Sequence, residues 1–130
     1  MSHILVIDDA PHIQIVVSEH LHLEGHTVDT AINGKEGLKL FELNHYDLVI
    51  TDVVMPEKDG FEVFAALKKK ASIVKIIYLS CGAARLDTQL LLKTAQAMGA
   101  DRVLPKPLDF FNLQIAVREV LAGGAADEKQ

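Results

Sequence analysis

The chain alternates short, apolar, β-branched runs with longer stretches of helical periodicity, and this alternation restricts the fold more than any other feature. His3–Ile7 is the first such run, and Pro11 opens a helical pattern that continues to Glu24. Apolar residues recur in this pattern near a 3.6-residue period, and Gly25 supplies a stop signal. The first 25 residues therefore predict a buried strand followed by a helix.

The same unit of a strand followed by a helix recurs four more times along the chain. The further strands are expected at residues 27–31, 46–51, 75–79 and 102–104. The helices that follow them are expected at residues 35–43, 61–70, 86–98 and 110–121. Five strands that alternate with five helices predict an α/β fold, with a parallel sheet covered by helices on both faces.

No internal repeat and no shift in composition marks a second domain, so we expect one domain over residues 1–122. Residues 123–130 begin with two glycines and lack periodicity. This segment is expected to be a flexible tail, although it could equally be part of a linker.

Composition narrows the classes of function and the expected location. Hydrophobic residues make up 49% and aromatic residues only 5%, so we expect an aliphatic core that suits buried parallel strands. The formal charge of -5 disfavours direct binding of nucleic acid or anionic lipid. No apolar run approaches the roughly 18 residues that cross a bilayer. The single cysteine, Cys81, forms no internal disulfide, and no leader opens the sequence, so a cytoplasmic protein is expected.

Polar residues follow four of the five expected strands. Asp8 and Asp9 follow the first strand, Asp52 the third, Ser80 the fourth and Lys106 the fifth. Because ligands of open parallel sheets bind outside the carboxyl ends of the strands, these five residues are expected on one rim. Carboxylates 4 Å apart repel by about 1 kcal/mol per pair in water and about 4 kcal/mol in a protein-like dielectric. A hard cation such as Mg²⁺ would compensate, since no cysteine or histidine accompanies them.

This pattern, together with Met55-Pro56, Asp59-Gly60 and Pro107, resembles the receiver domain of bacterial two-component response regulators over residues 3–121. An acidic pair at a strand end is by itself often a helix cap or a solvated turn, so the prediction depends on the combination. The resemblance implies a flavodoxin-like three-layer αβα fold with strand order 2-1-3-4-5. It also implies a phosphoacceptor that receives a phosphoryl group from a sensor histidine kinase or a phosphotransfer protein, and then controls a partner or output domain.

The resemblance assigns a metal-binding role to four residues. Asp9 and Asp52 would contact Mg²⁺ or Mn²⁺ directly, together with the backbone carbonyl of Val54. Asp8 would act mainly through water. In this family the metal bridges the attacking and the transferred oxygens.

The resemblance also assigns the phosphoryl chemistry. Asp52 would be the nucleophile that attacks phosphorus. Lys106 would pair first with Asp52 and later with a phosphoryl oxygen, while the Ser80 hydroxyl would donate to another oxygen. The domain would therefore catalyse only its own phosphorylation and dephosphorylation, and would not be an enzyme acting on other substrates.

The sequence departs from the family in the region that is expected to switch. Val103 stands where many members have a tyrosine or phenylalanine that changes rotamer. The segment from Ser80 to Gly99 is also longer than usual, and Cys81 and Gly82 open it. Because glycine is conformationally permissive, we expect this loop to move on phosphorylation in place of an aromatic side chain.

Two other functions use similar residues or the same fold. An aspartyl-nucleophile phosphatase shares the phosphoaspartate chemistry but needs a second acid two residues after its nucleophile, where this chain has Val54. An unphosphorylated interaction module or a flavin binder could also use this fold, because a fold alone does not determine function. The complete set of aspartates, serine and lysine disfavours an interaction module or a flavin binder.

Overall fold

The computed structural model describes residues 2–52, 66, 69, 74–80, 101–105 and 109–123. The strands are β1 (His3–Ile7), β2 (Thr27–Ala31), β3 (Leu48–Asp52), β4 (Lys75–Ser80) and β5 (Arg102–Pro105). The helices within the described residues are α1 (Pro11–Leu23), α2 (Gly34–Leu43) and α5 (Phe110–Leu121). Each of these helices follows a strand, as the alternating pattern predicts.

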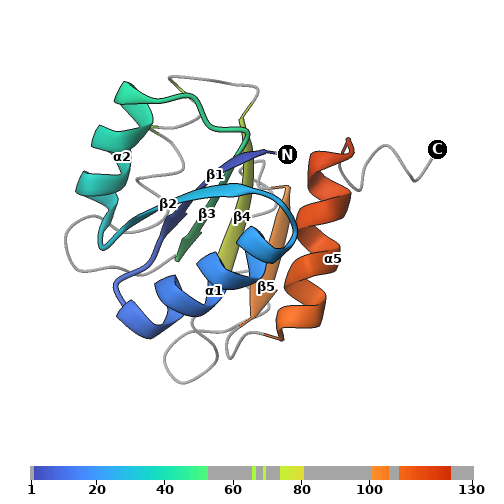
Figure 1. Ribbon diagram of the computed structural model, residues 1–130. Helices are drawn as coiled ribbons and strands as arrows, with labels where there is room; N and C mark the ends of the chain where they lie inside the picture. Colours follow the sequence, from blue (N-terminus) through green and yellow to red (C-terminus); the bar gives the residue numbers. More distant parts are fainter. Residues whose placement is uncertain are drawn as a thin grey trace.

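The five strands form one parallel sheet in the order β2-β1-β3-β4-β5. The order reverses at β1, which lies between β2 and β3 (Figure 1). A crevice outside the carboxyl ends of the strands at such a reversal is the usual binding position of this fold class. The parallel sheet and its strand order confirm the prediction.

Helices cover both faces of the sheet (Figure 1). One face packs against α1 and α5 through a buried cluster that includes Val17, Leu21 and Val117. The opposite face packs against α2 through a second cluster, with Leu38 and Phe41 at its border. All five residues of β3 are buried. A central strand covered on both faces explains why its sequence is a continuous apolar run rather than an alternating one.

Local sequence signals determine where the helices begin and end. Pro11 occupies the first turn of α1, and Gly25 beyond its end has a φ of 95°, a left-handed conformation that favours glycine. At the start of α2, the Asn33 side chain accepts a hydrogen bond from the Glu36 amide at 2.8 Å. The Glu36 carboxylate accepts one from the Ile32 amide, also at 2.8 Å. This reciprocal pair satisfies backbone donors at the helix start.

The expected strand at residues 46–51 is wrong at its start, because β3 begins at Leu48. Tyr46 is buried at 3% exposure without belonging to the strand, and its hydroxyl donates to Asp29 at 2.7 Å. Because its ring is buried like that of a strand residue, Tyr46 extended the apolar sequence pattern beyond the start of β3. Tyr78 is also completely buried, so the core is less purely aliphatic than composition suggests.

The expected helices at residues 61–70 and 86–98 lie essentially outside the described residues, as does the tail from residue 124 onward. The prediction of five helices therefore stays a prediction for those two. Among the described residues, no helix is long and apolar enough to span a membrane.

Candidate metal centre

Three carboxylates meet at the carboxyl edge of the two central strands. Asp8 follows the last residue of β1, and Asp52 is the last residue of β3. Ile7 pairs with Thr51, so the parallel register brings the next residue of each strand alongside the other. One carboxylate oxygen from each of Asp8, Asp9 and Asp52 can be chosen so that all three lie within 4.8 Å of one another. The sequence prediction that these residues share one rim is therefore confirmed in its geometry.

The three carboxylates differ in their exposure to solvent. Asp8 is 0% exposed and Asp52 is 4% exposed, whereas Asp9 is exposed. Two buried acidic side chains and one open one form a cluster with a protein side and a solvent side. A cation from solvent would therefore meet the exposed Asp9 carboxylate first.

The backbone around Asp8 is held by several hydrogen bonds. Its amide donates to the Ala31 carbonyl oxygen at 3.1 Å, which extends the contact between β1 and β2 by one residue. Its carboxylate Oδ1 accepts a hydrogen bond from the Ala10 amide at 2.9 Å. The Gln14 side-chain amide donates to the Asp8 carbonyl oxygen at 2.9 Å and to the Ala31 carbonyl oxygen at 2.8 Å. Asp8 is therefore fixed both through its main chain and through its side chain.

Sequence reasoning did not identify Gln14 or Thr51 as part of this region. Gln14 lies near the start of α1, where a polar side chain usually faces water. Its role is visible only from its hydrogen bonds to the ends of β1 and β2. Thr51 is fully buried, and its hydroxyl donates to the Asp52 carbonyl oxygen at 3.1 Å. The one signal available for that position was a threonine between the apolar run Leu48–Ile50 and Asp52.

The donor set fits a hard divalent cation. Ionised, the three side chains place three negative charges together, and each pair repels by several kcal/mol in a dielectric of about 20 at 4 Å. Carboxylate oxygens with room for water are the ligands that Mg²⁺ prefers. No histidine or cysteine belongs to this group within the described residues, which disfavours a softer metal.

The remaining predicted site residues are only partly described. Ser80 ends β4 and pairs with Pro105 at the end of β5, so the backbone of both reaches the rim on which Asp52 lies. Val103 pairs with Tyr78 and is half-buried against the cluster on the α2 face. Val54, Cys81, Gly82 and Lys106 lie outside the described residues.

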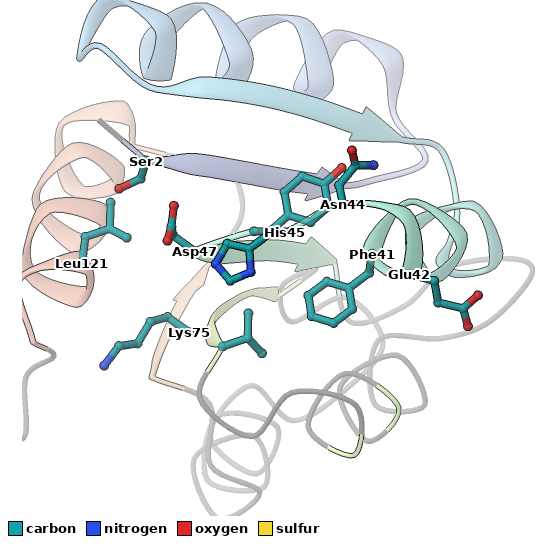
Figure 2. A pocket seen from close by; sticks show the side chains of 10 residues that line it. Ser2, Phe41, Glu42, Asn44, His45, Asp47, Lys75 and Leu121 are labelled. Atoms are coloured by element: carbon teal, nitrogen blue, oxygen red, sulfur yellow. The ribbon is translucent and has the colours of Figure 1, made fainter.

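A cavity of about 620 Å³ lies at the opposite, amino edge of the sheet. It is lined in part by Phe41, His45, Asp47, Lys75 and Leu121, which come from α2, the segment before β3, the start of β4 and the end of α5 (Figure 2). None of the three clustered aspartates contributes to it. This cavity and the acidic cluster therefore lie at opposite edges of the sheet.

The fold and the acidic cluster together define a class of protein. The sequence matches the response regulator receiver domain family over residues 4–118. The chain belongs to this family, whose members act in two-component signalling.

Solved structures of receiver domains resemble this chain along nearly its whole length. A receiver domain protein from Clostridium thermocellum is 31% identical, with a TM-score of 0.84 over 94% of this chain and 95% of that one. The response regulator protein TrrA from Thermotoga maritima, solved in complex with Mg²⁺ and BeF, is 38% identical. Its TM-score is 0.78 over 92% of this chain and 99% of that chain.

Longer regulators also match. The probable transcriptional regulator ycf27 of Cyanidium caldarium is 35% identical over 119 residues, which are 92% of this chain and 46% of that protein. The chain therefore spans about half the length of the curated relatives it matches.

Proposed function

We propose that this chain is the phosphoacceptor domain of a two-component pathway and that Asp52 carries the phosphoryl group. The observation that carries the proposal is the cluster of Asp8, Asp9 and Asp52, with carboxylate oxygens within 4.8 Å at the carboxyl edge of the sheet. Asp52 is the member at the end of the central strand, next to the point where the strand order reverses. This is where the fold class places reacting groups.

Asp9 and Asp52 would hold Mg²⁺ or Mn²⁺ with the Val54 backbone carbonyl, and Asp8 would act through water. The bound cation would neutralise charge on the transferred phosphoryl oxygens. Asp9 is the exposed carboxylate, so it can accept a cation that arrives from solvent. The Mg²⁺ in the TrrA complex belongs to that protein, and it supports the assignment by analogy.

In the transfer step, a carboxylate oxygen of Asp52 attacks the phosphorus of a phosphohistidine on a partner. An oxygen–phosphorus bond forms while the phosphorus–nitrogen bond breaks, and the electron pair returns to the imidazole, which takes a proton from solvent. The carbonyl of Asp52 accepts the Thr51 hydroxyl hydrogen bond, which limits rotation of the nucleophile's backbone. Asp52 is only 4% exposed, so little of the proposed nucleophile is open to solvent.

Ser80 and Lys106 complete the proposed chemistry. The Ser80 hydroxyl would donate to one phosphoryl oxygen and the Lys106 ammonium to another. The support is positional, because Ser80 pairs with Pro105, the residue directly before Lys106. Ser80 is the last residue of β4 and Lys106 directly follows β5, and both strands end on the rim beside Asp52.

Phosphorylation would add nearly two negative charges to this rim and shift the domain between two conformations. The donor would be a sensor histidine kinase or a histidine phosphotransfer protein, and the output a partner or a further domain. Some matched relatives carry the name transcriptional regulator and are about twice as long as this chain. In those relatives, the remaining length supports an output function outside the receiver domain.

The test is intact mass spectrometry after incubation with acetyl phosphate and Mg²⁺. The parent protein should gain one phosphoryl group, and Asp52→Asn should gain none because an amide is not nucleophilic. Asp47→Asn is the matched control, since Asp47 lies at the other edge of the sheet and accepts a hydrogen bond from the His3 amide at 2.9 Å. A parent that gains no mass, or an Asp52→Asn protein that still does, would refute the proposal. Continuous release of phosphate without a stable phosphoprotein would instead indicate an enzyme.

A further inference from the structure

We propose that Gln14 is a positioning residue, whose side-chain amide sets the orientation of the loop that carries Asp8 and Asp9. The inference rests on the proposed function, because it concerns the same metal centre. It adds a residue from α1 to a site otherwise built from strand ends.

Gln14 joins the ends of two strands through one nitrogen atom. Its Nε2 donates to the Asp8 carbonyl oxygen at 2.9 Å and to the Ala31 carbonyl oxygen at 2.8 Å. A glutamine amide has two N–H donors, so both hydrogen bonds form at once. The same Ala31 oxygen also accepts the Asp8 amide at 3.1 Å. The side chain thus anchors the end of β1, the end of β2 and the first turns of α1 to one another.

The hydrogen bond to the Asp8 carbonyl oxygen has a specific consequence for Asp9. That carbonyl belongs to the peptide group between Asp8 and Asp9, so fixing its direction fixes where the next Cα lies. Asp8 has its own side-chain anchor, because its Oδ1 accepts from the Ala10 amide. Asp9 is exposed, and within the described part of the chain no hydrogen bond or ion pair holds its carboxylate. Its position near Asp8 and Asp52 therefore depends on the backbone that Gln14 holds.

Few other side chains could make this contact. A glutamate would present acceptors to two carbonyl oxygens and add a fourth negative charge near the cluster. A methionine would fill a similar volume without any donor, and an asparagine is one methylene too short to span both oxygens. Partners that orient ligands in this way commonly change metal affinity by 10- to 100-fold when removed.

The experiment compares Gln14→Met with Gln114→Met, using calorimetric titration of Mg²⁺ and unfolding by urea. Gln114 is a matched control, because it is also a half-buried helical glutamine whose Nε2 donates to another element, Glu24 of the α1 C-cap, at 2.9 Å. We expect Gln14→Met to weaken Mg²⁺ binding about tenfold or more, and Gln114→Met to leave it unchanged. Both variants should lose similar stability. At saturating Mg²⁺, Gln14→Met should again be phosphorylated by acetyl phosphate, since Asp52 itself is intact.

Unchanged Mg²⁺ affinity in Gln14→Met would overturn the inference, as would an equal loss of affinity in Gln114→Met. If Gln14→Met does not fold, Gln14→Asn replaces it and should show the same loss of affinity. A parent protein that binds no Mg²⁺ would refute the proposed function instead. In that case, amide hydrogen exchange in metal-free protein tests the positioning role of Gln14. Exchange at the Asp9 and Ala10 amides should become faster in Gln14→Met but not in Gln114→Met. Unchanged exchange at both amides would reject it.

Discussion

Asp8 and Asp9 are adjacent in sequence but contribute to the molecule in different ways. Asp8 is fully buried and accepts a hydrogen bond from the Ala10 amide, so its side chain stabilises the turn into α1 as well as the acidic cluster. Asp9 is exposed and contributes no such contact among the described residues. A substitution of Asp9 can therefore test metal binding with little effect on folding, whereas a substitution of Asp8 would affect both.

We predict that Asp9→Ala weakens Mg²⁺ binding by at least about tenfold, which corresponds to roughly 1.4 kcal/mol. The free energy of unfolding without metal should change little, because an exposed carboxylate is removed from a cluster of like charges. Calorimetric titration and urea unfolding measure the two quantities. Glu19→Ala is the control, as Glu19 is an exposed acid on the outer side of α1. Equal Mg²⁺ affinities of the parent and Asp9→Ala would contradict a direct metal contact.

Tyr46 shows how one hydroxyl links sequence-distant segments at the amino edge of the sheet. It donates to Asp29 at 2.7 Å, and His3 Nε2 contacts the same carboxylate oxygen at 2.9 Å. Burial first, and then the hydrogen bond and charge of Asp29, raise the pKa of Tyr46 well above its ordinary value of 10.0. The folded protein therefore prefers the neutral phenol.

We predict that Tyr46→Phe lowers the free energy of unfolding by about 1–2 kcal/mol at pH 8, because the substitution removes the hydrogen bond to the Asp29 carboxylate. Because the folded-state pKa is raised, this contribution is complete below pH 10 and declines as pH rises above it, where the unfolded phenol ionises. Urea unfolding at pH 8 and pH 11 measures the difference between the two proteins. The difference should narrow at the higher pH, and a constant or growing difference would show that the linkage is wrong.

At the scale of elements, α2 approaches the sheet at a position that only glycine permits. A Cβ atom built on Gly37 would overlap Cδ1 and Cγ1 of Ile7, the last residue of β1. Alanine normally stabilises a helix relative to glycine by about 1 kcal/mol. Here the close packing of α2 on β1 opposes that gain. β1 is also the strand that leads to Asp8.

We predict that Gly37→Ala destabilises the protein by about 1–2 kcal/mol, because overpacking of a core usually costs about 1–3 kcal/mol. Ile7→Val removes Cδ1 and makes room for the new methyl group. The double variant should therefore be more stable than the sum of the two single effects, which a double-mutant cycle by urea unfolding measures. Additive effects would exclude the proposed contact between these two side chains.

At the scale of the whole molecule, the acidic cluster follows from the sequence for a physical reason, whereas the strand order is predicted from the family resemblance. Apolar runs that end in aspartate fix both the strand and its carboxyl edge, and a parallel sheet brings such edges together, so Asp8, Asp9 and Asp52 could be placed before their distances were known. The contacts of Gln14 and Tyr46 could not be predicted from the sequence. Their partners, Ala31 and Asp29, lie on β2, and periodicity contains no information on contacts between elements. The roles of Ser80 and Lys106 stay predictions.

The packing of Val103 bears on how a signal would cross the molecule. Val103 is β-branched and stiff at χ1, and it is half-buried beside Tyr78, which has no exposed surface. It has no hydroxyl that could exchange hydrogen-bond partners. A change at the phosphoryl site is therefore expected to leave this part of β5 unaltered.

We predict that the segment 81–87 carries the conformational change instead. Gly82 and the two alanines after it allow the backbone to follow Ser80 toward a phosphoryl group, and a shift between two states needs only a few kcal/mol of differential affinity. Hydrogen exchange with Mg²⁺, in the presence and absence of beryllofluoride as a phosphoryl mimic, measures this. Protection should change across residues 81–98 and stay constant at Val103. The same experiment on Asp9→Ala at low Mg²⁺ should show no change in protection at residues 81–98, because the mimic then lacks its cation. A large change at Val103 together with constant protection at residues 81–98 would show that β5, and not the loop after β4, reports phosphorylation.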